Sequence, residues 1–293
     1  MPEHKSAPLD EVVPLLKDFF AVHAKDRQAW FISVGCSEVH SPYDSYVPED
    51  ESNIEVPKYI PDCPESRQDL AGFYGAIRHM DKRVGDILDL LDKNDLSKNT
   101  IVIFTTDHGP AWPRAKISNY EPGMRCALIV RHPEAVPGQV VENMTSHVDI
   151  APTILEWMGE ENPVKMNGIS FAESVRGEMR KSQEYVFAED IATRTIRTEK
   201  FKYMLNFKDD LPVGVPMWLK TRQYAVDLAK AWSPLPKERL YDLEKDPLEQ
   251  KNLAYEKEYG DIKESLRNRL FKCLEDTNDR ILTGFIPERV VTR

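Results

Sequence analysis

The chain has 293 residues, enough for one large domain or two modest ones, and its hydrophobic content of 41% allows a buried core. A net charge of −10 excludes nonspecific nucleic-acid binding, which needs a basic face, but not a locally basic pocket for an anionic molecule. No run of 18 apolar residues is present, so the sequence predicts no membrane span. The four cysteines lack CxxC spacing and indicate neither a zinc site nor a disulfide framework.

The N-terminal third predicts two helices around one strand and a loop. Met1–Lys5 contains no apolar signal region, which leaves the compartment undetermined. Residues 9–24 have helical apolar spacing, residues 30–34 predict a buried strand, and the proline-rich residues 41–65 predict an irregular loop. A long helix is expected to open at Ser66, because apolar residues then recur at i, i+3, i+4 and i+7. Its apolar stripe is Leu70, Phe73, Ile77, Met80, Val84, Ile87, Leu88 and Leu91.

The most informative stretch is residues 101–109, where four apolar residues lead directly to Thr105-Thr106-Asp107-His108-Gly109. Such a run predicts a strand buried on both faces, as in parallel sheets covered by helices. Ligands collect at the carboxyl ends of strands in these sheets, and Asp107 and His108 offer an oxygen and a nitrogen there to a metal ion. The alternative is that Asp107 caps a turn and that Gly109 supplies a positive φ.

The predicted secondary structure changes near residue 160, from helices and buried strands to short antiparallel strands. Residues 128–130 predict a further strand, and Asp149 is expected to cap a helix that has Pro152 in its first turn and Gly159 past its end. Beyond them, residues 185–188, 195–198 and 201–205 predict short antiparallel strands, and residues 256–276 a charged amphipathic helix. We therefore expect one α/β domain in residues 1–160 and a smaller subdomain in residues 161–293.

Several short motifs occur in a recognisable order. Lys116 stands four residues ahead of Tyr120-Glu121-x-Gly123-x-Arg125, and His40-Ser41-Pro42 follows the predicted strand at 30–34. Val148-Asp149-x-x-Pro152-Thr153 opens the later helix. Near the C-terminus come Leu240-Tyr241-Asp242-Leu243, Asp246-Pro247-x-Glu249 and Asn252-Leu253. Each motif is weak alone, but together, from about residue 12 to about residue 275, the chain resembles the sulfatases of the alkaline phosphatase superfamily.

The resemblance implies a fold and a reaction class. The expected fold is α/β: an incomplete alkaline-phosphatase-like sheet, mixed but mainly parallel, between helices, followed by a small C-terminal antiparallel sheet with a packed helix. The implied reaction is metal-dependent hydrolysis of a sulfuric ester. The expected substrate is a sulfate-ester small molecule or glycan.

The resemblance also implies roles for four residues. Asp107 and His108 would bind a divalent cation, expected to be Ca²⁺, for which the carboxylate is the better ligand. Lys116 would contact the sulfate oxygens as a point charge. His40 would contact the sulfate or protonate the leaving oxygen, since imidazole titrates near neutral pH. Structural roles for either histidine and a solvated Lys116 are the alternatives.

One part of the family machinery is not found. The formylglycine nucleophile arises in a Cys/Ser-x-Pro/Ala-x-Arg motif, and no such motif occurs in these 293 residues. Cys63-Pro64-Glu65-Ser66-Arg67 has the Cys–Arg separation but the proline one place early, and Pro-Glu is better interpreted as a helix start. We expect the chain to be inactive alone and to correspond to the C-terminal portion of a sulfatase, as a truncated gene product or a genuine short protein.

Two other functions remain compatible with the sequence. One is a non-catalytic interaction module derived from a sulfatase, in which self-association or a partner chain covers an exposed sheet edge. The other is hydrolysis of phospho- or phosphonate esters by the same superfamily chemistry. If the protein is a hydrolase of sulfate or of phospho- or phosphonate esters, the residue 206–236 insertion, with Trp218 and Trp232, is expected to influence its substrate specificity.

Overall fold

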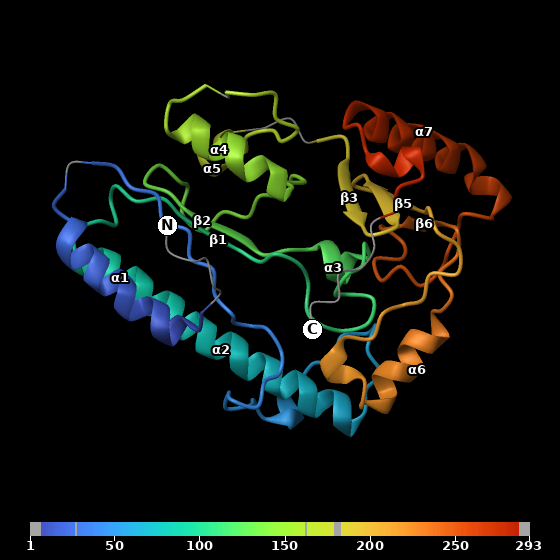
Figure 1. Ribbon diagram of the computed structural model, residues 1–293, viewed down its shortest axis with the longest axis horizontal. Helices are drawn as coiled ribbons and strands as arrows, with labels where there is room; N and C mark the ends of the chain where they lie inside the picture. The colour runs from blue at the N-terminus through green and yellow to red at the C-terminus, as the bar shows by residue number, and fades with distance from the viewer. Residues whose placement is uncertain (1–6, 27, 162, 179–182, 287–293) are drawn as a thin grey trace. The chain divides into compact units, whose positions relative to one another are not determined.

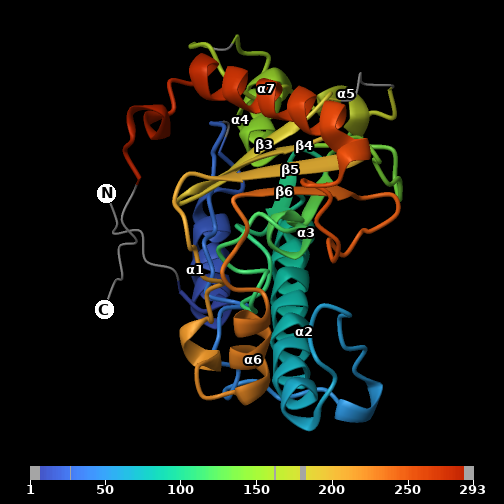
Figure 2. The same ribbon diagram turned by 90° about the vertical axis from the view of Figure 1, so that its right-hand side faces the viewer.

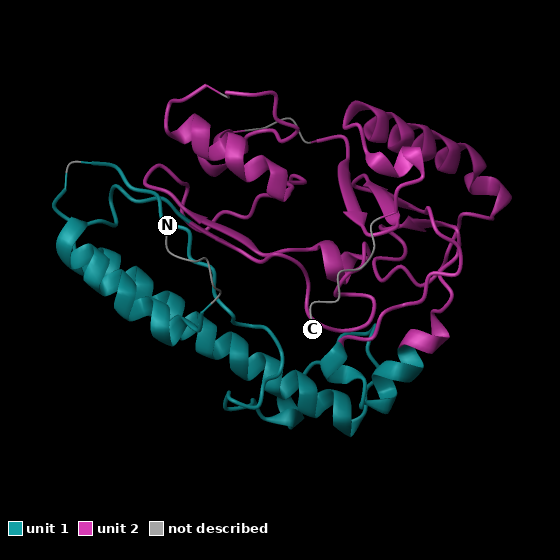
Figure 3. Ribbon diagram, in the orientation of Figure 1, with its two compact units in different colours: residues 1–102, 217–228 teal, residues 103–216, 229–293 magenta. Residues whose placement is uncertain are grey.

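The computed structural model describes residues 7–26, 28–161, 163–178 and 183–286. The chain divides into two compact units (Figure 3). Unit 1 comprises residues up to 102 together with 217–228, and unit 2 comprises 103–216 together with the residues from 229 onward. The boundary expected from the sequence at residue 160 stays a prediction. In the described part of the chain, no helix is long and apolar enough to cross a membrane.

Unit 1 is built on two helices that lie side by side (Figure 1), α1 (Leu9–His23) and α2 (Pro64–Lys93). Leu16 and Phe20 of α1 are buried in one cluster with Leu91 of α2 and with Leu96 just beyond it. Both helices were predicted from their apolar spacing and are confirmed. Their packing follows from that spacing, because residues three and four apart lie on one helix face.

The start of α2 confirms the interpretation of Cys63. This residue is the N-cap, and Pro64 occupies the first helical position, where its missing N–H costs nothing. The Cys63 N–H donates to the Ser66 hydroxyl at 3.1 Å. The preceding segment is irregular as predicted, apart from a single 3-10 turn, η1 (Glu51–Asn53).

Part of the residue 206–236 insertion packs on α2 within unit 1. This part contains η3 (Met217–Leu219) and the first turns of α6 (Gln223–Ala231). Asp69 of α2 accepts hydrogen bonds from the Arg222 guanidinium at 2.8 Å and the Tyr224 hydroxyl at 2.9 Å. Trp218 meets Tyr43 edge to face, with ring centroids 5.1 Å apart. These contacts give this part of the insertion a structural role.

The strand predicted for residues 30–34 is wrong. The segment is described in full and has no strand conformation, and Phe31 is 76% exposed. Apolar character predicts a strand only where a neighbouring strand supplies the hydrogen bonds of a ladder. Among the described residues, the nearest such contact is an isolated bridge between Ala7 and Cys36.

Unit 2 contains a two-stranded sheet of β1 (Val102–Thr105), whose first residue belongs to unit 1, and β2 (Leu128–Arg131). The Thr106 N–H donates to the Ala127 carbonyl at 3.3 Å, which places the end of β1 beside the beginning of β2. The expectation of burial on both faces is wrong for this pair, since most of its residues are half-buried and Ile129 is 64% exposed. The described residues supply no further strand to this sheet.

Between β2 and the second sheet lie η2 (His147–Asp149), α4 (Ile150–Trp157) and the short α5 (Ala172–Val175). Asp149 is fully buried, but its carboxylate does not cap α4 as predicted. It accepts instead from the N–H groups of Ser146 at 2.9 Å and Ile169 at 2.7 Å. The aspartate therefore ties together the segments before and after α4. Gly159, with φ of 71°, follows the helix as predicted.

The second sheet is antiparallel in the order β3-β4-β5-β6, as expected for the C-terminal region. Its strands are β3 (Val186–Asp190), β4 (Thr193–Arg197), β5 (Phe201–Asn206) and β6 (Glu238–Asp242). α7 (Gly260–Asp276) lies along one face of this sheet (Figure 2). It is preceded by η4 (Lys257–Tyr259) and followed by η5 (Arg280–Thr283). The strand β6 was not predicted.

The register of this sheet separates two different faces. Ile196, Tyr203 and Leu240 are direct cross-strand partners and pack with Leu266, Leu270 and Leu274 of α7 in one apolar core. Because side chains alternate along a strand, the next row, Arg197, Lys202 and Tyr241, points to the other face. Lys202 is nonetheless fully buried. That face therefore carries a buried polar layer, which positions the candidate site.

Candidate functional site

Asp107 and His108 lie just beyond the end of β1, as the sequence predicted for that strand. The Asp107 side chain is 87% exposed, and its Oδ1 accepts from the His108 N–H at 2.9 Å. The His108 Nδ1 lies 2.6 Å from the Gly109 carbonyl oxygen. A carbonyl only accepts, so Nδ1 must donate, which leaves Nε2 of the neutral ring with a free lone pair. Metal-binding histidines are commonly oriented by such a bond.

Asp107 and His108 have the right ligand atoms for a divalent cation, but two ligands are too few to hold one. Asp107 Oδ2 and His108 Nε2 are 3.5 Å apart, a separation compatible with two ligands of one ion. Calcium requires about six to eight oxygen ligands. Across the described residues, no group of three or more His, Cys, Asp or Glu side chains is arranged to hold a metal. The two residues can therefore supply part of a coordination sphere only.

A cavity of about 820 Å³ in unit 2 is lined by both residues. His147 and Arg125 also line it, together with Arg197, the last residue of β4. His147 Nε2 lies 3.0 Å from the Thr105 hydroxyl, which itself donates to the Ala127 carbonyl at 2.9 Å. The cavity thus gathers two imidazoles and two guanidinium groups with the carboxylates of Asp107, Glu121, Glu142, Glu189 and Asp190, a mixed lining that offers groups for both a cation and an anionic ligand.

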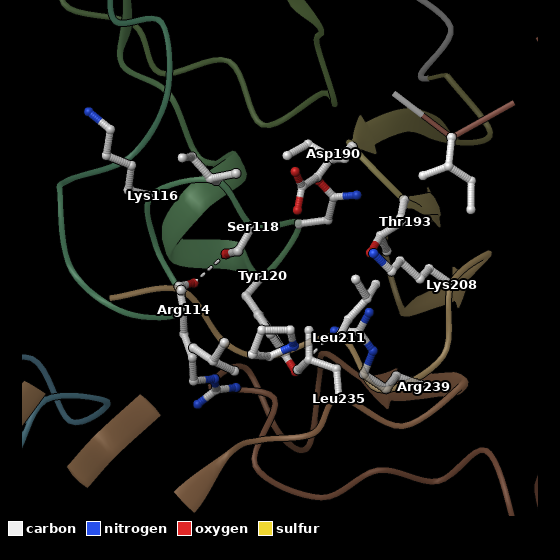
Figure 4. A pocket seen from close by; sticks show the side chains of 18 residues that line it. Arg114, Lys116, Ser118, Tyr120, Asp190, Thr193, Lys208, Leu211, Leu235 and Arg239 are labelled. Atoms are coloured by element: carbon white, nitrogen blue, oxygen red, sulfur yellow. Dashed lines mark hydrogen bonds between the residues drawn. The ribbon is translucent and has the colours of Figure 1, made fainter. Parts of the chain in front are cut away.

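Lys116 lies on the loop of residues 114–120 and lines a second cavity, of about 700 Å³ (Figure 4). The two cavities share lining residues, Ile117, Ser118, Asn119, Asp190 and Ile191. Asp107 and His108 on one side and Lys116 on the other therefore face neighbouring spaces separated by the segment 117–119. These three predicted residues belong to one unit, and the structure brings them to one region of it.

The loop of residues 114–120 is held by stacking and by a buried guanidinium. Arg114 lies over the rings of Trp232 at 3.7 Å and Tyr120 at 4.3 Å. Its Nη2 donates to the carbonyl of Glu249 at 2.9 Å. Such cation–π contacts are stronger when desolvated, and Arg114 is only 2% exposed. The loop that carries Lys116 is therefore fixed to the C-terminal part of the chain.

A buried charge cluster fixes the end of the same loop. Lys202 Nζ lies 2.6 Å from Glu121 Oε1 and 2.8 Å from Glu249 Oε1, and donates to the Asn119 carbonyl at 3.1 Å. The Glu121 N–H donates to Glu249 Oε2 at 2.6 Å. The Tyr-Glu-x-Gly-x-Arg and Asp-Pro-x-Glu motifs therefore meet in space, around one lysine.

The two carboxyl groups of this cluster respond differently to their surroundings. Burial works to raise the pKa of Glu121, but Lys202 and Arg197 outweigh it, and the pKa is lowered. Burial raises the pKa of Glu249, and Lys202 only partly offsets that effect. The difference is physically consistent, because Glu249 is completely buried and shares its lysine, whereas Glu121 has Arg197 as a second cation at 3.4 Å.

His40 belongs to unit 1, whereas the other predicted site residues belong to unit 2. Its side chain is exposed, and its Nδ1 lies 2.6 Å from the Ser41 carbonyl oxygen. By the same argument as for His108, Nδ1 donates to this carbonyl. Its role as a substrate contact stays a prediction.

The sequence did not single out His147, Lys202 or Glu249 as parts of this region. The signal for His147 was its place directly before Val148-Asp149, a motif that was interpreted only as a helix start. Lys202 lies in a predicted strand, where a lysine ordinarily indicates a solvent-facing position.

Comparison with known proteins identifies the family. The sequence model of the sulfatase family matches residues 7–160, and that of the N-sulphoglucosamine sulphohydrolase C-terminal region matches residues 114–276. The chain belongs to the sulfatase family, whose members in general use a divalent cation. The resemblance inferred from the ordered motifs is thereby confirmed, as is the α/β fold class.

Curated relatives are similar over most of this chain. An ulvan-active sulfatase of Formosa agariphila is 30% identical over 284 residues, covering 90% of this chain and 46% of that protein. Human N-sulphoglucosamine sulphohydrolase is 28% identical over 262 residues, covering 78% of this chain and 52% of that protein. The chain thus spans about half the length of the curated relatives it matches.

Solved structures share the fold at lower identity. A putative sulfatase from Bacteroides fragilis superposes with a TM-score of 0.71 at 22% identity, covering 92% of this chain and 59% of that one. A phosphonate monoester hydrolase of Agrobacterium radiobacter superposes with a TM-score of 0.65 at 20% identity, covering 90% and 61%. These similarities concern the fold, and they include both sulfatases and a phosphonate hydrolase.

Proposed function

We propose that this chain supplies the sulfate-binding and part of the metal-binding side chains of a hydrolase acting on sulfuric esters of saccharides. The observation that carries the proposal is the meeting of Asp107, His108 and Lys116 at two adjoining cavities in a member of the sulfatase family. Two relatives named for sulfated saccharides, ulvan and N-sulphoglucosamine, support the substrate class.

Each residue has a role that its chemistry suits. Lys116 neutralises oxygens of the sulfate as charge develops on the leaving group. His40, with Nδ1 held by the Ser41 carbonyl, uses Nε2 to contact the sulfate or to protonate the leaving oxygen. Asp107 and His108 contribute two ligands to the divalent cation, proposed to be Ca²⁺, which would polarise the sulfate when bound.

The proposal includes inactivity of the 293 residues on their own. They contain no Cys/Ser-x-Pro/Ala-x-Arg motif to provide a formylglycine, and catalytic groups act as a unit, so loss of the nucleophile removes nearly all the rate enhancement. With an aryl sulfate and Ca²⁺, we expect no more turnover by the chain than by a Lys116→Ala, His40→Ala double variant. Turnover well above that control would contradict this part of the proposal.

Binding tests the substrate class separately from catalysis. Titration with an aryl sulfate and with the matching aryl phosphonate should show tighter binding of the sulfate, reduced by Lys116→Ala about fivefold or more. Lys272→Ala removes the same charge from a 75% exposed position on α7 and is the matched control. Preference for the phosphonate would favour the alternative function, which shares this fold.

A further inference from the structure

The cavity that Lys116 lines is unusually cationic for an acidic protein. Four cationic side chains and one carboxylate line it, in a chain of net charge −10: Arg114, Lys116, Lys208, Arg239 and Asp190. In Figure 4, Lys208 and Arg239 lie toward one side of the cavity, and Lys116 lies at the opposite edge with its ammonium directed away from them. The cations are therefore spread across the space rather than gathered at one point.

Arg239, on β6, is a buried cation without a carboxylate partner among the described residues. It is 2% exposed, and its guanidinium donates to Asn206 Oδ1 at 2.6 Å and to the Tyr120 hydroxyl at 3.2 Å. Its Nε is buried with no hydrogen-bond partner. The partners of the guanidinium among the described residues are neutral, so its positive charge is not balanced locally and favours an anion in the cavity it lines.

Lys208 provides a second cation without a counter-ion. Its side chain is exposed, and the described part of the structure gives it neither an ion pair nor a hydrogen bond. Nearby Lys237, by contrast, pairs with Asp209 at 2.9 Å. A lysine at the rim and an arginine in the wall of one cavity can share an anionic group between them.

The remaining lining suits the ring of a sugar. Apolar side chains form much of the wall, namely Ile117, Ile191, Leu211, Pro212, Val213, Leu235 and Ile286. Such a wall can cover the C–H face of a saccharide while the cations contact its charged substituents. The volume of about 700 Å³ exceeds what a sulfate group alone would fill.

We propose that this cavity, through Lys208 and Arg239, binds a second anionic substituent of a sulfated saccharide whose reacting sulfate lies at Lys116. The inference rests on the proposed function and deepens it, because it defines the substrate as a saccharide with at least two anionic groups. The second group is a sulfate or a carboxylate, which a guanidinium and an ammonium recognise by the same chemistry.

The test is a titration of the full 293-residue chain with three probes: a hexosamine monosulfate, the same hexosamine with two sulfates, and a monosulfated disaccharide carrying a uronate. The chain should bind one or both dianions about tenfold more tightly than the monosulfate. Lys208→Ala should reduce that preference to about twofold and leave monosulfate binding unchanged. Lys272→Ala, with the same loss of charge, should leave the preference intact.

The two proposals fail in different ways. A preference for dianions that survives Lys208→Ala, or its absence from the unmodified chain, overturns the assignment of this cavity. Monosulfate binding that is unaffected by Lys116→Ala overturns the proposed function instead. The dianion whose tighter binding is lost in Lys208→Ala identifies the second group: the disulfate indicates a sulfate and the uronate disaccharide a carboxylate. Because Lys208 is exposed, its replacement should leave the fold intact.

Discussion

Two regions of unit 2 carry charged residues from family motifs, and they treat charge in opposite ways. Around Lys202, the charges are buried and nearly every one has a partner within hydrogen-bond distance. At the end of β1, the Asp107 carboxylate is 87% exposed and accepts a hydrogen bond from the neighbouring His108 N–H. Buried charges that have partners stabilise the fold and position the loop, whereas an exposed carboxylate remains available to bind a ligand. Motif membership alone does not separate these roles, but burial does.

Removing the central lysine should give the largest effect. Lys202→Met leaves Glu121 and Glu249 buried without their shared cation, and breaking a buried pair from one side costs about 3–5 kcal/mol. We expect that loss in the free energy of unfolding measured with urea. Lys200→Met, in which the lost partner is the exposed Glu244, should change the free energy of unfolding far less, because solvent screens that pair. Equal effects of the two substitutions would remove the contrast between the regions.

Acidification should change the contributions of Glu121 and Glu249 to stability in opposite directions, and by less than Lys202→Met does. The folded pKa of Glu121 is lowered, so its stabilisation is present above pH 4.5, the ordinary value, and is lost as pH falls through the folded pKa. Glu249 has a raised pKa, so its contribution is present below pH 4.5 and is lost as pH rises through its folded value.

Glu121→Gln should therefore flatten the fall in stability below pH 4.5, measured as urea midpoints from pH 6 to pH 3. Glu244→Gln, at a 61% exposed side chain, is the control and should keep the steeper profile of the unmodified chain. If Glu121→Gln retained the full acid dependence, the low pKa assigned to Glu121 would be incorrect. The total change should be smaller than that caused by Lys202→Met.

Asp107→Ala should have the smallest effect on stability. The side chain is exposed and lies outside the buried network, so the free energy of unfolding should change by less than about 0.5 kcal/mol. If Asp107 and His108 bind Ca²⁺ as proposed, the dissociation constant should be high, about 10⁻⁴–10⁻³ M, because the described residues hold no group of three or more candidate ligands, and Asp107→Ala should abolish the binding. Calorimetric titration measures this, and unchanged calcium binding would exclude Asp107 as a ligand.

The sequence predicted those elements whose pattern depends on apolar spacing. α1, α2, α7 and the strands β3 to β5 follow from period and turn residues, and the strand end at Asp107 followed from the same reasoning. The strand at 30–34 failed because pairing depends on a neighbouring strand, which a local pattern does not reveal.

The buried polar layer was not predictable for a different reason. β6 reads Glu-Arg-Leu-Tyr-Asp, with charges at positions that turned out to be buried, so its pattern resembles a turn more than a strand. Lys202 and Arg239 are buried because partners from residues 119–121 and 206 reach them, and those partners are distant in sequence. Single-residue preferences place lysine and arginine outside, and only the assembled contacts reverse that expectation.

The hydrogen bond between Glu121 and Glu249 affects when the loop of residues 114–120 can fold during translation. The two residues are separated by 128 positions, and Lys202 lies between them in the chain. A nascent chain that has emerged only as far as β2 already contains Lys116 and the local hydrogen bonds of its loop, but not Lys202, Trp232 or Glu249, which fix that loop. The loop can reach its final geometry only after residue 249 has been made, because long-range contacts must be closed before they stabilise. The loop that carries Lys116 is therefore among the later parts of this unit to reach its final geometry.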